Sequence, residues 1–168
     1  MKRLGLHPAI IAAASTHFVV DAYGNLYAPL LPVLIPRLGL NFAMAGTLAM
    51  LFQIASSVSQ LGFGALADRG YARLFLLTGP ILTVTVLSGI ASVNSTPMLA
   101  AVLLIGGLGG AAFHPPAAAL VHTVSDHRKG FSMSLHITGG SLGMAMAPLV
   151  FVPMVTALGQ GWSWLIAI

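Results

Sequence analysis

The sequence predicts an all-α membrane protein, and two observations lead to that prediction. Apolar residues make up 57% of the 168 positions and charged residues only 6%, whereas about a quarter of the residues in a soluble domain are charged. The apolar residues form long runs, each of which could cross a hydrocarbon core roughly 30 Å thick as a helix. The composition therefore excludes a water-soluble globular protein.

Five apolar runs of about 20 residues or more predict five membrane-spanning helices. The expected helices cover approximately 9–33, 43–66, 74–93, 98–121 and 131–158. A sixth run covers 162–168, which is too short to span a membrane. We therefore expect residues 1–168 to form one transmembrane bundle, truncated within its sixth helix.

The positions of the cations predict how the bundle is oriented. Of the seven Lys and Arg residues, Arg37 alone follows the first run. The other six fall in the segments expected on the opposite side: Lys2, Arg3, Arg69, Arg73, Arg128 and Lys129. Because cytoplasmic segments carry the excess of Lys and Arg, the amino terminus is expected in the cytoplasm.

Asp21 lies near the middle of the first run, where an ionised carboxylate costs roughly 2.5 to 3.5 kcal/mol. His17 and Asn25 are each four residues away from it, so all three side chains share one helix face. If that face borders a water-filled cavity, His17 and Asp21 form a proton-sensitive pair of the kind that couples protons to transport. The alternative is a structural pair that fixes helix packing.

The fourth run contains Phe-His-Pro-Pro at 113–116. Two adjacent prolines remove two backbone donors, so the helix is expected to break or kink there. Irregular backbone within a membrane is tolerated beside a cavity, which makes His114 a candidate ligand or proton group; a packed core histidine is the alternative. His136 is expected to face either the cavity or the cytoplasmic mouth. Gln53 lines a pathway or bonds a neighbouring helix.

Small residues at four-residue intervals predict close contacts between helices. Gly106 and Gly110 form one such pair, and Gly139 and Gly143 form another. Such spacing lets helix backbones approach closely in a membrane. Pro115 and Pro148 are expected to bend their helices.

Motifs for enzymatic chemistry are absent from the sequence. It has no HExxH zinc motif, no nucleotide-binding loop and no GxSxG element, and it has no Cys for a thiolate metal site or a thiol nucleophile. We expect neither an enzyme nor a bound cofactor or metal. The cations form no basic stripe, so no nucleic-acid partner is expected.

The run 64–69 reads Gly-Ala-Leu-Ala-Asp-Arg and is followed by Arg73. It resembles the signature of the major facilitator superfamily, and it occurs at the expected position between the second and third helices. Gly64 begins the motif. Asp68 sits poorly at the negative end of its helix, so we expect it to pair with Arg69, Arg73 or the amino end of another helix. Such a charged patch is a candidate cytoplasmic latch.

Within that superfamily, the sequence is similar to the fosmidomycin resistance family of efflux proteins. The similar segments occur in the order of that family: Thr16-His17 with Asp21, 27–31, 51–57, Phe113-His114-Pro115, and the stretch from Gly139-Gly140 to Pro148. An acidic residue commonly follows Phe-His-Pro in that family, and Pro116 takes its place here.

The resemblance implies two six-helix bundles that bind substrate between them and rock to give alternating access. It also implies the partners: a small-molecule substrate, protons, the lipid bilayer and a missing carboxy-terminal bundle. The expected location is the bacterial cytoplasmic membrane. Our first hypothesis is proton-coupled efflux of small or drug-like molecules, with Asp21 and His17 as proton groups and His114 beside the cavity. The alternatives are a metabolite importer or facilitator, and a membrane scaffold that transports nothing.

Overall fold

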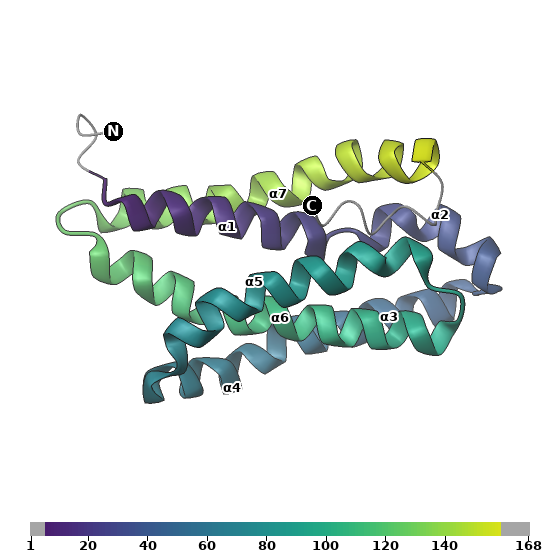
Figure 1. Cartoon of the computed structure of the whole chain (residues 1–168), viewed down its shortest axis with the longest axis horizontal. Coiled ribbons are helices and arrows are strands. Elements are labelled where there is room, and N and C mark those ends of the chain that lie inside the picture. Colours follow the sequence, from purple (N-terminus) through teal and green to yellow (C-terminus); the bar gives the residue numbers. More distant parts are fainter. Residues whose placement is uncertain (1–5, 159–168) are drawn as a thin grey trace.

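The computed structural model describes residues 6–158 as helices joined by short connections, with no strand among these residues. This arrangement confirms the predicted all-α class (Figure 1). The principal helices are α1 (Pro8–Gly24), α2 (Tyr27–Leu38), α3 (Phe42–Gln53), α4 (Ser59–Leu66), α5 (Ala72–Ser88), α6 (Thr96–Val124) and α7 (Lys129–Leu158). The predicted sixth helix at 162–168, together with Lys2 and Arg3, lies outside the described residues.

Four helical stretches of the described chain are long and apolar enough to cross a membrane: Pro8–Leu38, Phe42–Ser92, Thr96–Val124 and Lys129–Ala157. The second stretch is 51 residues long, and the chain turns back within it at Gly70, whose φ is 102°. Figure 1 shows α4 and α5 running in opposite directions on the two sides of this turn. Glycine suits the turn because a positive φ costs it no steric penalty.

The first apolar run is divided into two helices, an interruption that was not predicted. α1 ends at Gly24, and the backbone N–H of Asn25 bonds back to the carbonyl oxygens of Asp21 and Tyr23. α2 then begins at Tyr27 and continues through Pro32 and Pro36 to Leu38, past the predicted end near residue 33. The interruption therefore lies one turn beyond Asp21, and the prolines lie inside helix.

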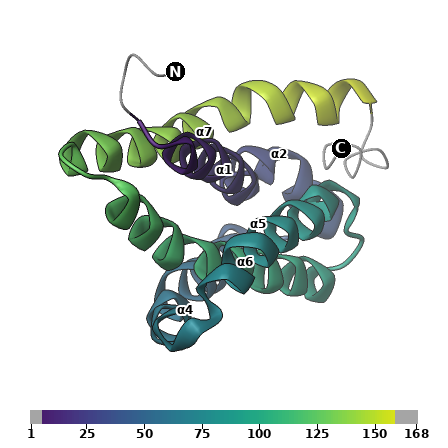
Figure 2. The same ribbon diagram turned by 60° about the vertical axis from the view of Figure 1, so that its left-hand side comes forward.

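A break or a kink was expected at Pro115 and Pro116. α6 remains helical through both prolines, so the helix does not break there. Figures 1 and 2 both show the second half of α6, drawn in green, running at an angle to its first half. The bend is the kink that two successive prolines favour. The helix hydrogen bonds on either side are sufficient to carry the chain through it.

Two glycine-lined seams hold the bundle together. α1 packs mainly against α7, and α5 against α6, as Figures 1 and 2 show. In the α1–α7 seam (Gly139, Gly140, Gly143) and the α5–α6 seam (Gly79, Gly106, Gly109), a Cβ atom on any of the six glycines would collide with the facing helix. Missing side chains therefore set both helix separations.

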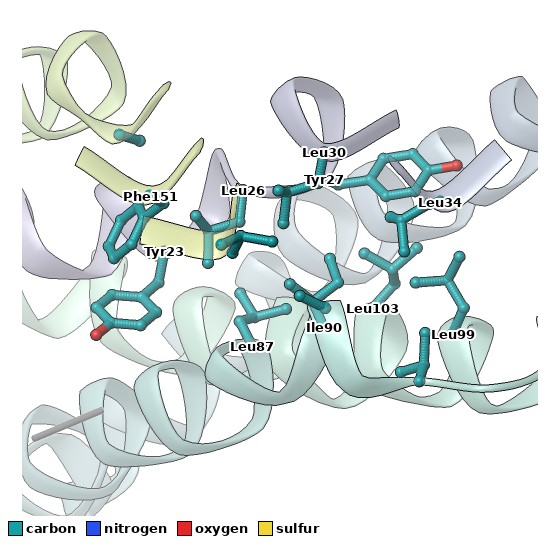
Figure 3. Close-up of a cluster of buried hydrophobic side chains, with 14 of the residues drawn as sticks. Tyr23, Leu26, Tyr27, Leu30, Leu34, Leu87, Ile90, Leu99, Leu103 and Phe151 are labelled. Carbon is teal, nitrogen blue, oxygen red and sulfur yellow. The ribbon is translucent and has the colours of Figure 1, made fainter. Parts of the chain in front are cut away.

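A large apolar core fills the end of the bundle formed by α2, the end of α5, the start of α6 and the end of α7 (Figure 3). Leu34, Leu99 and Leu103 are fully buried there. The Tyr23 and Phe151 rings pack with centroids 5.0 Å apart. Arg37 donates hydrogen bonds to the carbonyl oxygens of Ala91 and Val93, which ties the end of α2 to the connection before α6.

Large apolar side chains also cover the outside of the bundle. Phe42 is 86% exposed, Leu61 80% and Leu149 68%. A soluble monomer rarely exposes extended apolar surface, whereas lipid tails are as apolar as leucine. The outer surface of the helices therefore suits a hydrocarbon environment.

Candidate functional site

Asp21 is the centre of a charged cluster between α1 and α6. Its Oδ2 atom lies 3.2 Å from Nε2 of His17, and its Oδ1 atom lies 3.5 Å from Nε2 of His114. The three side chains are between 13% and 24% exposed. The structure therefore brings one carboxylate between two imidazoles, in the middle of the Pro8–Leu38 stretch.

The chain reaches this geometry by simple local means. His17 and Asp21 lie one turn apart on α1, as their spacing predicts. His114 comes from α6, and its ring centroid lies 5.0 Å from that of His17. α7 can pass beside them because Gly140 has no side chain: a Cβ there would lie 2.6 Å from Nε2 of His17 and would also meet the Asp21 carboxylate.

His136 reaches the cluster from α7 through its backbone and its ring. Its carbonyl oxygen lies 2.9 Å from Nδ1 of His17, and since a carbonyl only accepts, Nδ1 carries the hydrogen. A neutral His17 then directs the lone pair of Nε2 at the Asp21 carboxylate, so two acceptors face each other. A cation between them removes that repulsion: either a proton, which makes His17 an imidazolium, or a metal ion.

The His136 ring itself is 3% exposed and lies 4.3 Å, between centroids, from the ring of His17. The sequence left open whether His136 faces a cavity or the cytoplasmic mouth. In the structure it lies beside His17 and borders a cavity of about 450 Å³, called the second cavity below. That cavity is also lined by His17, Gln60 and His114. The cluster thus stands between two hollows in the bundle.

A cavity of about 350 Å³ lies on the other side of the cluster, and we call it the main cavity because residues from all seven helices, α1 to α7, line it. Its lining combines glycine and other apolar residues with these polar residues: Asp21, Asn25, Gln53, Ser56, Ser57, Gln60, Thr83 and His114. Ser56 and Ser57 belong to a π-helical stretch, Ile54–Val58, between α3 and α4. Such stretches occur frequently at functional sites.

Asn25 and Gln53 both border this cavity. Asn25 also donates from Nδ2 to the carbonyl oxygen of Met144, at 2.9 Å. It therefore ties the junction of α1 and α2 to α7. Thr83 and Met144 line the cavity too, and sequence reasoning missed both because neither residue type is unusual in an apolar helix.

The glycines of the expected small-residue pairs do not all lie at contacts between helices. Gly106 packs against Leu87, and Gly139 and Gly143 pack against the α1 backbone at Ala14 and Phe18. Gly110 instead borders the main cavity, with nothing closer than 3.7 Å to an added Cβ. In the tight α5–α6 contact the glycine is Gly109, whose added Cβ would lie 2.8 Å from the carbonyl oxygen of Gly79.

The remaining packing and bending candidates lie inside helices. Gly64 in α4 lies beside Pro115, whose Cβ would be 3.7 Å from a Cβ on Gly64. Pro115 also lines the second cavity. Pro148 lies within α7, where it is half-buried.

The charged motif lies at the turn between α4 and α5. Asp68 and Arg69 are in the five-residue stretch Ala67–Tyr71, and Arg73 is in the first turn of α5. All three side chains are exposed. The ion pairs found within the described residues do not include Asp68, so its expected partners Arg69 and Arg73 are not in contact with it here.

Among the described residues, a group of three side chains that could together bind a metal ion occurs only at the cluster. The ligand atoms of His17, Asp21 and His114 all lie within 4.8 Å of one another. Elsewhere the exposed His122 and His127 lie near the connection between α6 and α7, away from any such grouping in the described chain.

Comparison with known proteins identifies the family. The model of the Major Facilitator Superfamily matches residues 13–168. The chain belongs to the major facilitator superfamily. Its membership, together with the long apolar helices, makes it part of an integral membrane protein of a transporter family and not an enzyme. The predicted resemblance is therefore confirmed.

Three relatives illustrate the range of this similarity. The chain is 29% identical, over 95% of its length, to an uncharacterized MFS-type transporter of Bacillus subtilis, YfnC. It is 28% identical, over 89% of its length, to the fosmidomycin resistance protein of Escherichia coli. It is 32% identical, over 79% of its length, to the multidrug resistance protein MdtG of Enterobacter lignolyticus.

This major facilitator chain spans only part of each relative. It covers 39% of YfnC, 37% of the fosmidomycin resistance protein and 33% of MdtG. No solved structure matches the chain significantly.

Proposed function

We propose that this chain forms half of a secondary active transporter that exports small or drug-like molecules in exchange for protons. The observation that carries the proposal is a carboxylate, Asp21, held between two imidazoles on the wall of a cavity. A charged group within a membrane-spanning helix is costly, and it typically marks a substrate or ion pathway. The names of the relatives, which include fosmidomycin and multidrug resistance proteins, support export.

In this proposal, protonation of the cluster is the step that couples proton movement to transport. When Asp21 is charged and an imidazolium faces it, the attraction holds α6 against α1. When the carboxylate takes up a proton, that attraction is lost and α6 is free to shift relative to α1 and α7. A change of net charge at a helix contact thus biases two conformations, as alternating access requires.

Substrate is proposed to bind in the main cavity. Asn25, Gln53 and His114 offer hydrogen-bonding groups among apolar side chains, the combination typical of small-molecule pockets. His136 borders the second cavity and completes the set of proton groups. A carboxy-terminal bundle would supply the opposite wall, as in other major facilitator proteins.

The charged motif is proposed to act as a latch. Gly64, Asp68, Arg69 and Arg73 lie together near the turn at Gly70, and the three charged side chains are exposed. Because Asp68 has no ion pair with either arginine here, we assign its partner to another part of the protein. The positive-inside rule supports a cytoplasmic position for this turn and for the amino terminus, in a bacterial cytoplasmic membrane.

Transport in proteoliposomes tests the proposal. The protein that carries this chain is reconstituted, and uphill substrate movement is driven by an imposed pH gradient. Asp21→Asn keeps the shape of the side chain but removes its charge, so we expect gradient-driven transport to fall at least about 100-fold, within the contribution typical of proton-transfer groups. Asp126→Asn is the matched control, because it makes the same change at an exposed residue in the connection before α7.

The outcomes separate the hypotheses. Full gradient-driven transport by Asp21→Asn would remove Asp21 from the mechanism. Proton flux in the same direction as substrate would replace export by import, and absence of any flux in the unmodified protein would favour a scaffold. Retained downhill exchange in Asp21→Asn, with lost uphill transport, is the result we expect from a coupling residue.

A further inference from the structure

Three donor atoms of two types converge at the cluster. They are Nε2 of His17, a carboxylate oxygen of Asp21 and Nε2 of His114, all within 4.8 Å of one another. Two imidazoles and one carboxylate make up the protein ligand set of one common class of open zinc site. The question is whether the geometry around these atoms suits an ion as well as their chemistry does.

The separations fit a tetrahedral ion. Zinc binds imidazole nitrogen and carboxylate oxygen at about 2.0 to 2.2 Å, so two donors on one tetrahedral ion lie roughly 3.4 Å apart. Nε2 of His17 lies 3.2 Å from Oδ2 of Asp21, and Nε2 of His114 lies 3.5 Å from Oδ1, so each separation is close to this value although the two nitrogens face different oxygens of the carboxylate. The two imidazole nitrogens lie within 4.8 Å of each other, and a movement of either side chain that brings them closer would complete the set.

The groups behind the donors favour a metal ligand too. A metal-binding histidine usually donates its second ring N–H to a carbonyl or carboxylate, which fixes the tautomer. Nδ1 of His17 makes such a bond, to the carbonyl oxygen of His136 at 2.9 Å. Nε2 of His17 thereby faces the Asp21 carboxylate, and either a proton or a metal ion can lie between the two atoms.

Access and charge are also suitable. Asp21 and His114 border the main cavity, and His17 and His114 border the second one, so an ion can reach the donors and keep a water as its fourth ligand. One carboxylate and two neutral imidazoles offset one of the two charges of the ion. Imidazole donors favour zinc, nickel or cobalt over magnesium and calcium, which prefer oxygen ligands.

We propose that His17, Asp21 and His114 form a binding site for one divalent transition-metal ion of the zinc class. The site goes beyond the proposed transport function, because it requires only the described geometry and no movement of protons or substrate. An ion there would link α1 to α6 directly.

Equilibrium titration with Zn²⁺ tests the site. The protein that carries this chain is purified in detergent with an affinity tag free of histidine, stripped with a chelator and titrated. The background variant carries His122→Gln and His127→Gln, which removes two exposed imidazoles outside the cluster. We expect this background to retain a site for one Zn²⁺. His17→Gln, Asp21→Asn or His114→Gln should each lower the Zn²⁺ affinity more than about 100-fold, a larger loss than is typical when a residue that only supports a metal ligand is changed.

Two further readouts distinguish a built site from scattered surface binding. Co²⁺ should give the visible absorption of a four-coordinate ion in the background variant and lose it in Asp21→Asn, whereas Mg²⁺ should neither bind nor compete. Zn²⁺ should also raise the thermal unfolding temperature of the background variant, because a ligand that binds only the folded state stabilises it. The same rise should be absent in Asp21→Asn and His114→Gln.

The proposal is overturned if Zn²⁺ affinity in folded Asp21→Asn and His114→Gln equals that of the background. Unfolding temperatures measured without metal show whether each variant is folded, and the three separate variants guard against failure of one of them. Loss of gradient-driven transport is scored separately. A protein that binds Zn²⁺ at these residues but moves no protons would disprove the transport proposal and leave the metal site intact.

Discussion

The α1–α7 seam and the α5–α6 seam are both built from glycine, yet they meet different neighbours. In the α5–α6 seam, a Cβ on Gly109 would press on backbone and on Thr83, at 2.5 to 2.8 Å. In the α1–α7 seam, a Cβ on Gly140 would meet the movable ends of His17 and Asp21. Gly139 and Gly143 in that seam would press on the α1 backbone as Gly109 does on α5, because an added Cβ on either would collide with a carbonyl oxygen. The lack of a side chain therefore sets the helix separation in both seams, and at Gly140 it also makes room for a charged cluster.

Of the substitutions considered below, Gly109→Ala is expected to have the largest effect on stability. The added methyl group has no room because the Gly79 carbonyl oxygen and the Thr83 backbone nitrogen would each lie 2.8 Å away, and backbone atoms cannot move without separating the helices. We expect a loss of about 3 kcal/mol, the upper part of the usual range for overpacking. Thermal unfolding in detergent, followed by the monodisperse fraction, measures it.

Gly110→Ala is the matched control, one residue along α6. Its new methyl group would lie no closer than 3.7 Å to any neighbour and would face the main cavity. We expect the unfolding temperature to stay close to that of the unmodified protein. Equal losses in the two variants would show that the α5–α6 seam does not depend on close backbone contact at Gly109.

The contrast between Gly109 and Gly110 also shows which features of the fold could be predicted from the sequence. Apolar runs predicted the helical class because a membrane forces backbone groups to bond within each segment. Spacing on a single helix placed His17 beside Asp21. The spacing of Gly106 and Gly110 could not reveal that Gly109 makes the tight contact, because that depends on how α5 is rotated against α6.

In the candidate site too, the sequence could not predict which residues of different helices lie next to each other. His114 and His136 were recognised as unusual, but their positions around Asp21 depend on the path of α6 and α7. The interruption at Asn25 was missed because no proline or glycine pair marks it uniquely. The role of Gly140 was missed, since nothing in the local sequence indicates that it faces two ionisable side chains.

Gly140→Ala should affect function more than stability. His17 and Asp21 can rotate away from a new methyl group, at a small energetic cost, but their contact would be lost. On the proposed function, we expect gradient-driven transport to fall at least about tenfold, with a smaller drop in unfolding temperature than in Gly109→Ala. Proteoliposome transport and thermal unfolding on the same preparations measure both.

Gly130→Ala provides the control for that experiment. It makes the same substitution near the start of α7, where an added Cβ would have no neighbour within 4 Å. Transport should be unchanged in this variant. If Gly140→Ala also transported normally, the close approach of α7 to the cluster would be only a packing feature.

The smallest effect should come from Asn25→Ala, which tests how the α1–α7 seam continues past the charged cluster. The substitution removes the hydrogen bond from Nδ2 to the Met144 carbonyl oxygen. Hydrogen bonds between membrane helices contribute about 0.6 kcal/mol on average and up to about 1.7 kcal/mol. We expect a loss in that range by thermal unfolding. Because the same side chain borders the main cavity, a loss of substrate affinity much larger than this range would mean that Asn25 contacts substrate as well as α7.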